Sequence, residues 1–216
     1  MKKWIGAMFL VTLMQTAFAQ DFKNVEKSLL LNNYESAKTE YEKAVAKKAS
    51  LETTAEGYYW KSKIYAGLSK DAAKNPDAYE ILKSALVQYI KLDQASGYAI
   101  AKENGQDPFF EVYAKSFKDG AGAFNDKKWK QAATDFETAL EFSDIIYSNG
   151  WASSKQKFDT NALVYAGYAN QNANNSEKTL AIYKRMADSK FSSPEYADIY
   201  KYILVKYIDN KDKASF

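Results

Sequence analysis

The sequence contains neither cysteine nor histidine, and these two absences exclude several kinds of chemistry. A Ser-His-Asp triad and a Cys-His pair both need histidine, and many zinc sites are built on imidazole or thiolate ligands. Histidine is also the side chain that most readily changes its charge near neutral pH. Without disulfides the fold must be stabilised by packing alone, for which a chain of 216 residues is sufficient. We therefore expect no enzyme activity, no metal and no cofactor.

Proline is scarce as well, with Pro76, Pro108 and Pro194 as its only occurrences. Each lies between segments in which apolar residues recur at helical spacing, where a helix has to end. No stretch of alternating β-branched residues lies between turn pairs, as strands would require. The fold class predicted for the chain beyond its N-terminal segment is all-α.

The N-terminal segment is typical of an export signal, with Lys2 and Lys3 ahead of an apolar run over residues 4–14. The triplet Ala-Phe-Ala at 17–19 supplies small residues at both positions that a signal peptidase reads. We expect residues 1–19 to be the signal peptide, cleaved between Ala19 and Gln20. The exported chain is then periplasmic or secreted.

Long apolar runs are otherwise missing. Residues 4–14 are too few for a transmembrane helix, which needs roughly 20, and no later run is longer. No cysteine follows the expected cleavage site to carry a lipid anchor. We therefore expect no membrane span once the signal peptide is removed.

Charge of one sign is not in excess either. Two of the 30 basic residues are Lys2 and Lys3, so 28 basic side chains face 27 acidic ones in the remainder. The two signs alternate along the chain and form no basic face. Nucleic-acid binding, which needs phosphate neutralisation, is therefore not expected.

Two stretches share a skeleton of small and aromatic residues, NYESAKTEYEKAV at 33–45 and KWKQAATDFETAL at 128–140. In each, a small residue is followed by an aromatic residue four positions later and by a small residue seven positions later. The same spacing starts at Ala78 and, more weakly, at Thr179. The four marker positions are Ala37, Ala78, Ala132 and Thr179, and the residues twelve positions earlier are Val25, Ala66, Gly120 and Gly167.

This skeleton resembles the tetratricopeptide repeat (TPR) family, whose unit of 34 residues is a pair of antiparallel helices. Small residues let two helix axes approach closely, and the ring one turn later fills the space beside the crossing. The resemblance implies an α-solenoid over residues 20–216, with about four repeats and the start of a fifth after Pro194. The markers lie more than 34 residues apart, so we expect irregular repeats with inserted loops. An irregular helical bundle is the alternative fold, and the fifth repeat is either cut short or serves as a cap.

The resemblance implies a groove lined by the first helix of each repeat. The expected groove positions include Trp60 and Lys63 in the second repeat, Phe117, Phe124 and Asn125 in the third, and Asn161, Val164, Tyr168, Gln171 and Asn172 in the fourth. A clamp for a terminal carboxylate would need asparagine where Gly67 stands, so no clamp is predicted. Ordinary packing or solvation is the alternative role for every groove residue.

Two long insertions are further candidates for ligand contact. The first, residues 94–117, carries turn signals at Asn104-Gly105 and Asp107-Pro108 and then a pair, Phe109-Phe110, that we expect to be exposed. The second, residues 143–160, places Trp151 beside an Asn-Gly turn. Loops inserted in solenoids often bind ligands, which makes Phe110 and Trp151 candidate contacts. Alternatively, both rings cover a neighbouring repeat.

We expect an exported TPR scaffold that binds a protein or peptide, with a role in assembling the cell envelope. An all-helical carbohydrate-binding or carbohydrate-active protein is the second hypothesis, suggested by 17 tyrosines and four tryptophans. A structural spacer within a longer polypeptide is the third. Carboxylate pairs such as Asp107 and Glu111 are interpreted as solvated groups on helix surfaces.

Overall fold

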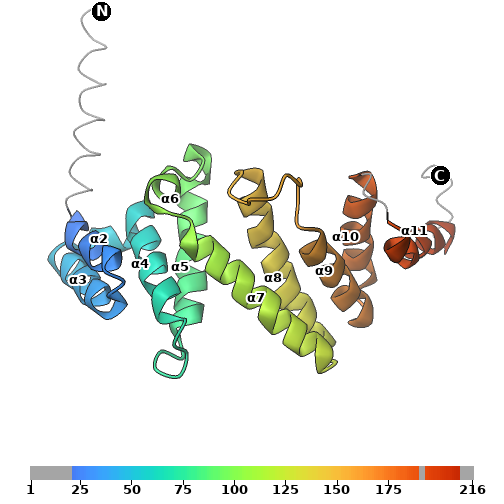
Figure 1. The fold of residues 1–216 in the computed structure, drawn as a ribbon, viewed down its shortest axis with the longest axis horizontal. Helices are drawn as coiled ribbons and strands as arrows, with labels where there is room; N and C mark the ends of the chain where they lie inside the picture. Colours follow the sequence, from blue (N-terminus) through green and yellow to red (C-terminus); the bar gives the residue numbers. More distant parts are fainter. Residues whose placement is uncertain (1–20, 190–192, 210–216) are drawn as a thin grey trace, which may run out of the picture. The chain divides into compact units, whose positions relative to one another are not determined.

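The computed structural model describes residues 21–189 and 193–209, and this part of the chain contains ten α-helices and no β-strand (Figure 1). The all-α prediction is therefore confirmed for these residues. The predicted signal peptide, residues 1–19, and the end of the predicted fifth repeat, residues 210–216, lie outside the described part. The chain divides into two compact units between Phe109 and Phe110.

The first unit is built from helices that contact their neighbours in chain order, α2 with α3, α3 with α4, and α4 with α5. The α2–α3 and α4–α5 pairs are helical hairpins (Figure 1). Two short 3₁₀ helices, η1 and η2, follow α3 and α5. The bounds are α2 Lys23–Leu30, α3 Tyr34–Lys47, η1 Ala49–Thr53, α4 Ala55–Leu68, α5 Ala78–Asp93, η2 Gln94–Ser96 and α6 Ala99–Asn104.

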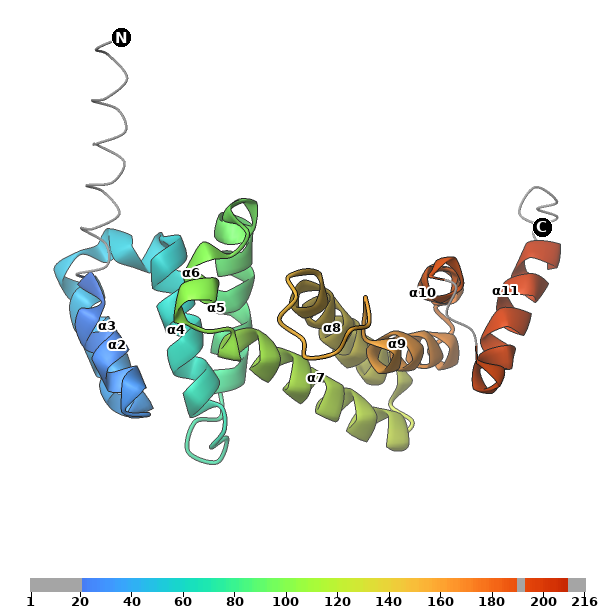
Figure 2. The same ribbon diagram turned by 45° about the horizontal axis from the view of Figure 1, so that its top comes forward.

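The second unit follows the same order of contacts, with α8 against α9, α9 against α10, and α10 against α11 (Figure 2). Helix α7 begins just before the boundary between the units and packs its aromatic residues on α8 in the second. The bounds are α7 Asp107–Asn125, α8 Trp129–Ser148, α9 Thr160–Asn172, α10 Ser176–Asp188, η3 Pro194–Tyr196 and α11 Ala197–Asp209.

Three helices begin at a side chain that accepts a hydrogen bond from the first turn. Asn33 caps α3, Thr54 caps α4 and Asp159 caps α9, with acceptor distances of 3.1, 2.9 and 3.0 Å. These residue types satisfy backbone N–H groups that have no partner within the helix. The starts of these helices are therefore fixed by local sequence.

The small residues of the predicted skeleton are buried, as expected. Ala37, Ala132 and Thr179 are 0% exposed, and Ala78 is 3% exposed. The residues four positions later are buried too, with Tyr41 at 6%, Leu82 and Phe136 at 0% and Tyr183 at 1%.

Two glycines mark where rings from the next helix press against the backbone. A Cβ placed on Gly120 would lie 3.0 Å from the ring of Phe136, and one on Gly167 would overlap the ring of Tyr183. The ring therefore occupies the space that a side chain would take, at the same offset in α7–α8 and α9–α10. The sequence predicts that the ring fills the space beside the crossing of the two helices. In the structure the ring packs directly against the glycine backbone, which is a tighter contact.

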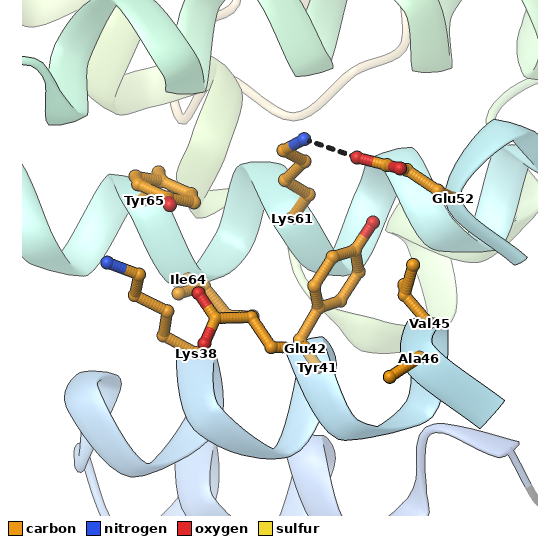
Figure 3. Close-up of a pocket in the computed structure, with 9 residues that line it drawn as sticks. All are labelled: Lys38, Tyr41, Glu42, Val45, Ala46, Glu52, Lys61, Ile64 and Tyr65. Atoms are coloured by element: carbon orange, nitrogen blue, oxygen red, sulfur yellow. Dashed lines mark hydrogen bonds and ion pairs between the residues drawn. The ribbon is translucent and has the colours of Figure 1, made fainter. Parts of the chain in front are cut away.

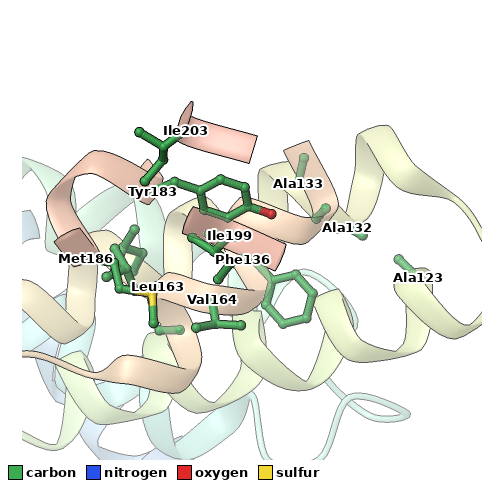
Figure 4. Packing of buried hydrophobic residues seen from close by; sticks show 14 residues of the cluster. Ala123, Ala132, Ala133, Phe136, Leu163, Val164, Tyr183, Met186, Ile199 and Ile203 are labelled. Atoms are coloured by element: carbon green, nitrogen blue, oxygen red, sulfur yellow. The ribbon is translucent and has the colours of Figure 1, made fainter. Parts of the chain in front are cut away.

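The core of the second unit joins side chains from α7, α8, α9, α10 and α11 (Figure 4). Phe136 and Tyr183 are its largest buried rings, and Leu163, Met186 and Ile199 fill the space around them with 1% exposure each. This continuous core supports the elements that carry the candidate site.

The first long insertion, residues 94–117, is mostly helical, and this differs from the predicted loop. It contains η2, α6 and the start of α7. Gly105 is the C-cap of α6 and adopts a φ of 103°, so the Asn104-Gly105 pair marks the end of a helix and not a separate turn. Pro108, by contrast, is the second residue of α7, because proline fits the first turn of a helix, where an N–H has no intrahelical acceptor.

The predicted exposed pair Phe109-Phe110 is split by this helix. Phe109 is 0% exposed and packs edge-to-face against Tyr98, with ring centroids 5.7 Å apart. Phe110 is 38% exposed. Successive helix residues point about 100° apart, since a turn holds 3.6 residues, and this rotation separates the two rings.

Candidate functional site

The predicted ligand contacts of the first unit are already engaged within it. Trp60 is 5% exposed, and its indole nitrogen donates to Glu56 at 3.3 Å. The Lys63 ammonium donates to the Asn104 carbonyl and lies 3.3 Å from the Asp107 carboxylate. Trp60 therefore belongs to the core, and Lys63 ties α4 to the end of α6 and the start of α7. Neither residue enters the candidate site.

Five rings in the second unit form a contact network, which we call the ring cluster. Its members are Phe117 and Phe124 of α7, Trp129 and Phe136 of α8, and Tyr165 of α9. Tyr165 stacks on Phe136 with centroids 5.4 Å apart and an interplanar angle of 20°. It also meets Phe117 and Phe124 edge-to-face, at 5.8 and 6.2 Å.

The ring cluster runs from the core to the surface. Phe136 is 0% exposed at its base, and Tyr165 is 41% exposed at its outer side. Each aromatic pair of this geometry contributes about 0.5–1.5 kcal/mol beyond area burial. Tyr165 is thus a surface ring that three other rings hold in place.

The hydroxyl of Tyr165 has no hydrogen-bond partner among the described residues, and the side chain is exposed enough for it to reach solvent. Tyrosine with an apolar body against other rings and a free hydroxyl is a common anchor in protein interfaces. The ring cluster therefore offers both an apolar face and a polar group to a ligand.

Residues of α9 continue the site along one side of that helix. Asn161, Tyr165, Tyr168 and Asn172 are spaced by four, three and four residues, which places them on one face. Asn161 is exposed and unpartnered among the residues that the structure describes. Tyr168 is half-buried, and burial raises the pKa of its hydroxyl.

The other predicted amide residues lie near the ends of α7 and α9. Asn125, the last residue of α7, is exposed. Gln171 accepts a hydrogen bond from the Tyr183 hydroxyl at 2.7 Å. The Asn172 amide donates to the carbonyl of Tyr168 at 2.8 Å. Gln171 and Asn172 therefore already form hydrogen bonds within the unit, whereas the side chains of Asn125 and Asn161 are available to bind a ligand.

Tyr165 is the residue that the sequence reasoning missed. Counting positions within the fourth repeat selected Val164, which is 6% exposed and lies in the core. The shift of one residue turns the side chain by about 100° around the helix. The spacing of Asn161, Tyr165, Tyr168 and Asn172 was the signal that could have found it.

The predicted loop contacts, Phe110 and Trp151, lie near the second inserted segment. Phe110 lines a cavity of about 170 Å³ together with Tyr113, Tyr147 and Asp159. Gly150 has a φ of 68°, so the predicted Asn-Gly turn is present. The Trp151 backbone N–H donates to Ile146 at 2.9 Å, and the Trp151 side chain is half-buried. The cavity is small for a ligand site, since such pockets usually hold about 300–1,000 Å³.

Acidic side chains in the described part form ion pairs and caps. Asp107 pairs with Lys63, and Asp159 caps α9 while accepting a hydrogen bond from the Tyr113 hydroxyl. Within residues 21–189 and 193–209 no three acidic residues are grouped to hold a metal ion. No helix of those residues has the length and apolar character of a membrane span.

Comparison with known proteins adds no relative. No family model matches the chain, and neither the curated proteins nor the solved structures contain a match to it. The fold class and the surface chemistry are therefore the basis for any functional conclusion.

Proposed function

We propose that this protein is an exported helical-repeat scaffold of the TPR type, and that it binds a segment of another protein on the ring cluster and the adjoining face of α9. The observation that carries the proposal is the position of Tyr165, 41% exposed and held by three phenylalanines. A rigid ring loses little conformational freedom on binding, and for this reason aromatic residues dominate binding energy in interfaces.

The repeat assignment is supported by recurring packing in both units. Buried small residues stand at all four marker positions, and consecutive helices pack in chain order. The glycine-to-ring contact recurs at the same offset, Gly120 to Phe136 and Gly167 to Tyr183. Stacked antiparallel hairpins account for all three features.

The export assignment is supported by the signal features of residues 1–19. Intact-mass measurement of protein purified from the periplasm of a bacterial host tests it. Cleavage between Ala19 and Gln20 is expected, and recovery of the uncleaved chain from the cytoplasm would contradict export.

The chemistry of the surface indicates the kind of segment that fits. The ring cluster presents an apolar face, and Asn161 and Asn125 add amide donors and acceptors without charge. Amide side chains match the N–H and C=O groups of a peptide backbone. We infer that the partner presents an uncharged segment with at least one aromatic or large aliphatic side chain.

Affinity capture with matched variants tests the proposal. The mature chain is immobilised, proteins of the cell envelope are passed over it, and a retained protein is then titrated against each variant. Tyr165→Ala and Asn161→Arg should both weaken binding, the first by removing the anchor and the second by blocking the face. Lys130→Ala, at an exposed site on α8, is the control and should bind as the wild type does. Equal affinity of all three variants would refute the proposed surface.

A further inference from the structure

A separate cavity of about 330 Å³ lies between α3 and α4 in the first unit (Figure 3). This volume falls at the lower end of the range for small-molecule sites, about 300–1,000 Å³. Its apolar wall is formed by Val45, Ala46 and Ile64, with the ring of Tyr65 beside them. The cavity shares no residue with the ring cluster, so its function can be tested independently of the protein-binding proposal.

Tyr41 contributes a buried hydroxyl that has no hydrogen-bond partner among the described residues. The side chain is 6% exposed, and its ring stacks on Phe22 with centroids 5.6 Å apart. In Figure 3 the hydroxyl points toward the ion pair of Lys61 and Glu52, whose charged atoms are 3.0 Å apart. A buried hydroxyl without a partner is unfavourable, so this group is suited to a ligand that supplies one.

Burial, and after it the charge of Glu52, raises the pKa of the Tyr41 hydroxyl. The group therefore stays protonated at neutral pH and can donate a hydrogen bond. A ligand that satisfies it must bring an acceptor oxygen into the cavity.

The charged residues around the cavity balance each other. Lys38 and Lys61 are matched by Glu42 and Glu52, so neither an anion nor a cation is favoured by net charge. Within the described residues Glu42 has no ion-pair partner, and the Lys38 ammonium lies 6.0 Å from the ring centroid of Tyr65. The rim therefore offers both donors and acceptors to a ligand that is itself neutral.

We propose that this cavity binds a neutral disaccharide. Sugar hydroxyls both donate and accept hydrogen bonds, so they can satisfy Tyr41, Glu42 and Lys38 together. The C–H face of a sugar ring matches the apolar wall and the ring of Tyr65. No charge is brought into the cavity, in keeping with its balanced rim.

Isothermal titration calorimetry of the mature chain with maltose, cellobiose and N,N′-diacetylchitobiose tests this inference. Saturable binding of at least one disaccharide is expected. Tyr41→Phe should weaken it about tenfold, the effect of losing one hydrogen bond in a buried site. Glu42→Ala should weaken it as well, and because Glu42 is exposed this variant does not threaten the fold.

Matched control variants distinguish loss of a contact in the cavity from general effects of removing a hydroxyl or a carboxylate. Tyr183→Phe removes a buried hydroxyl in the other unit, and Glu141→Ala removes an exposed helix carboxylate there. Both should bind the sugar as the wild type does. The inference is overturned if no disaccharide saturates the protein, if Tyr41→Phe binds equally well, or if glycylglycine or glutamate binds more tightly than all three sugars.

Discussion

Glycine at position 167 is needed because the ring of Tyr183 occupies the space of a Cβ. Gly122 is the opposite case, since a Cβ there would meet nothing within 4 Å. Both glycines lie in helices, so they share the backbone cost of glycine and differ only in their surroundings. Comparing alanine substitutions at the two positions therefore separates the effect of packing on stability from the effect of helix propensity.

Gly167→Ala should lower the free energy of unfolding by about 1–3 kcal/mol, because Tyr183 must move away. Gly122→Ala should raise it by about 0.5–1 kcal/mol, because alanine favours the helix. Urea unfolding followed by circular dichroism measures both. A stabilising Gly167→Ala would show that α9 and α10 do not approach as described.

Two buried tyrosines should respond in opposite directions to loss of the hydroxyl. Tyr41→Phe should raise the free energy of unfolding by about 1 kcal/mol, because an unpaired polar group leaves the interior. Tyr183→Phe should lower it by about 1 kcal/mol, because the hydrogen bond to Gln171 is lost. Chemical denaturation in the absence of sugar measures the two changes. A destabilising Tyr41→Phe would indicate that its hydroxyl has a partner within the protein.

At the scale of helices, the start of α9 depends on Asp159. Its carboxylate accepts from the backbone N–H of Ala162 at 3.0 Å and from the Tyr113 hydroxyl. This helix carries Asn161 and Tyr165, so its first turn positions part of the candidate surface.

Asp159→Ala should lower the free energy of unfolding by about 0.5–2 kcal/mol through loss of the helix cap. The Tyr113 hydroxyl also loses its acceptor, so the total decrease should be larger. A double-mutant cycle with Tyr113→Phe measures the interaction free energy between the Tyr113 hydroxyl and the Asp159 carboxylate, separately from the loss of the helix cap. Additive effects of the two substitutions would contradict the described contact.

Helices and buried markers could be predicted from sequence because they depend on periodicity, which tolerates small errors in position. The order of apolar residues and the capping residue types define each helix locally. The side chains that reach the surface were harder to predict, because an error of one residue places a side chain on a different face of the helix. Val164 and Tyr165 show this on α9, and Phe109 and Phe110 show it on α7.

Whether an aromatic side chain is buried or exposed also depends on tertiary contacts, which cannot be predicted from the spacing of residues in the sequence. Trp60 was expected at a ligand surface, yet it packs edge-to-face on Tyr59 in the core, with centroids 5.1 Å apart. The unpaired hydroxyl of Tyr41 had no signal in the sequence either. It depends on which residues of α4 and η1 surround it after folding.

For the whole molecule, stability should change little around neutral pH and fall at alkaline values. The chain has no histidine, so no imidazole titrates between about pH 6 and 8. Burial raises the pKa values of several tyrosines above the ordinary value of 10.0, and the shift is large for Tyr41, Tyr59, Tyr89, Tyr113 and Tyr183.

Because the folded-state pKa values are raised, the unfolded chain loses these protons first as pH rises. The stability from the neutral tyrosines is fully present below pH 10 and decreases above it, by about 1.4 kcal/mol per pH unit for each tyrosine. Urea unfolding at neutral pH and at about pH 11, with tyrosinate absorbance recorded in parallel, measures this. Equal stability at the two pH values would contradict the burial of these hydroxyls.

We propose that the ring cluster and the adjoining face of α9 bind a segment of another protein. Photo-crosslinking tests it most directly, with p-benzoylphenylalanine placed at position 165 in one variant and at position 130 on α8 in another, followed by mapping of the adducts. We expect position 165 to crosslink to one defined segment of a partner and position 130 to give no adduct with that segment. Adducts at position 130 alone, or the same adducts at both positions, would contradict the claim.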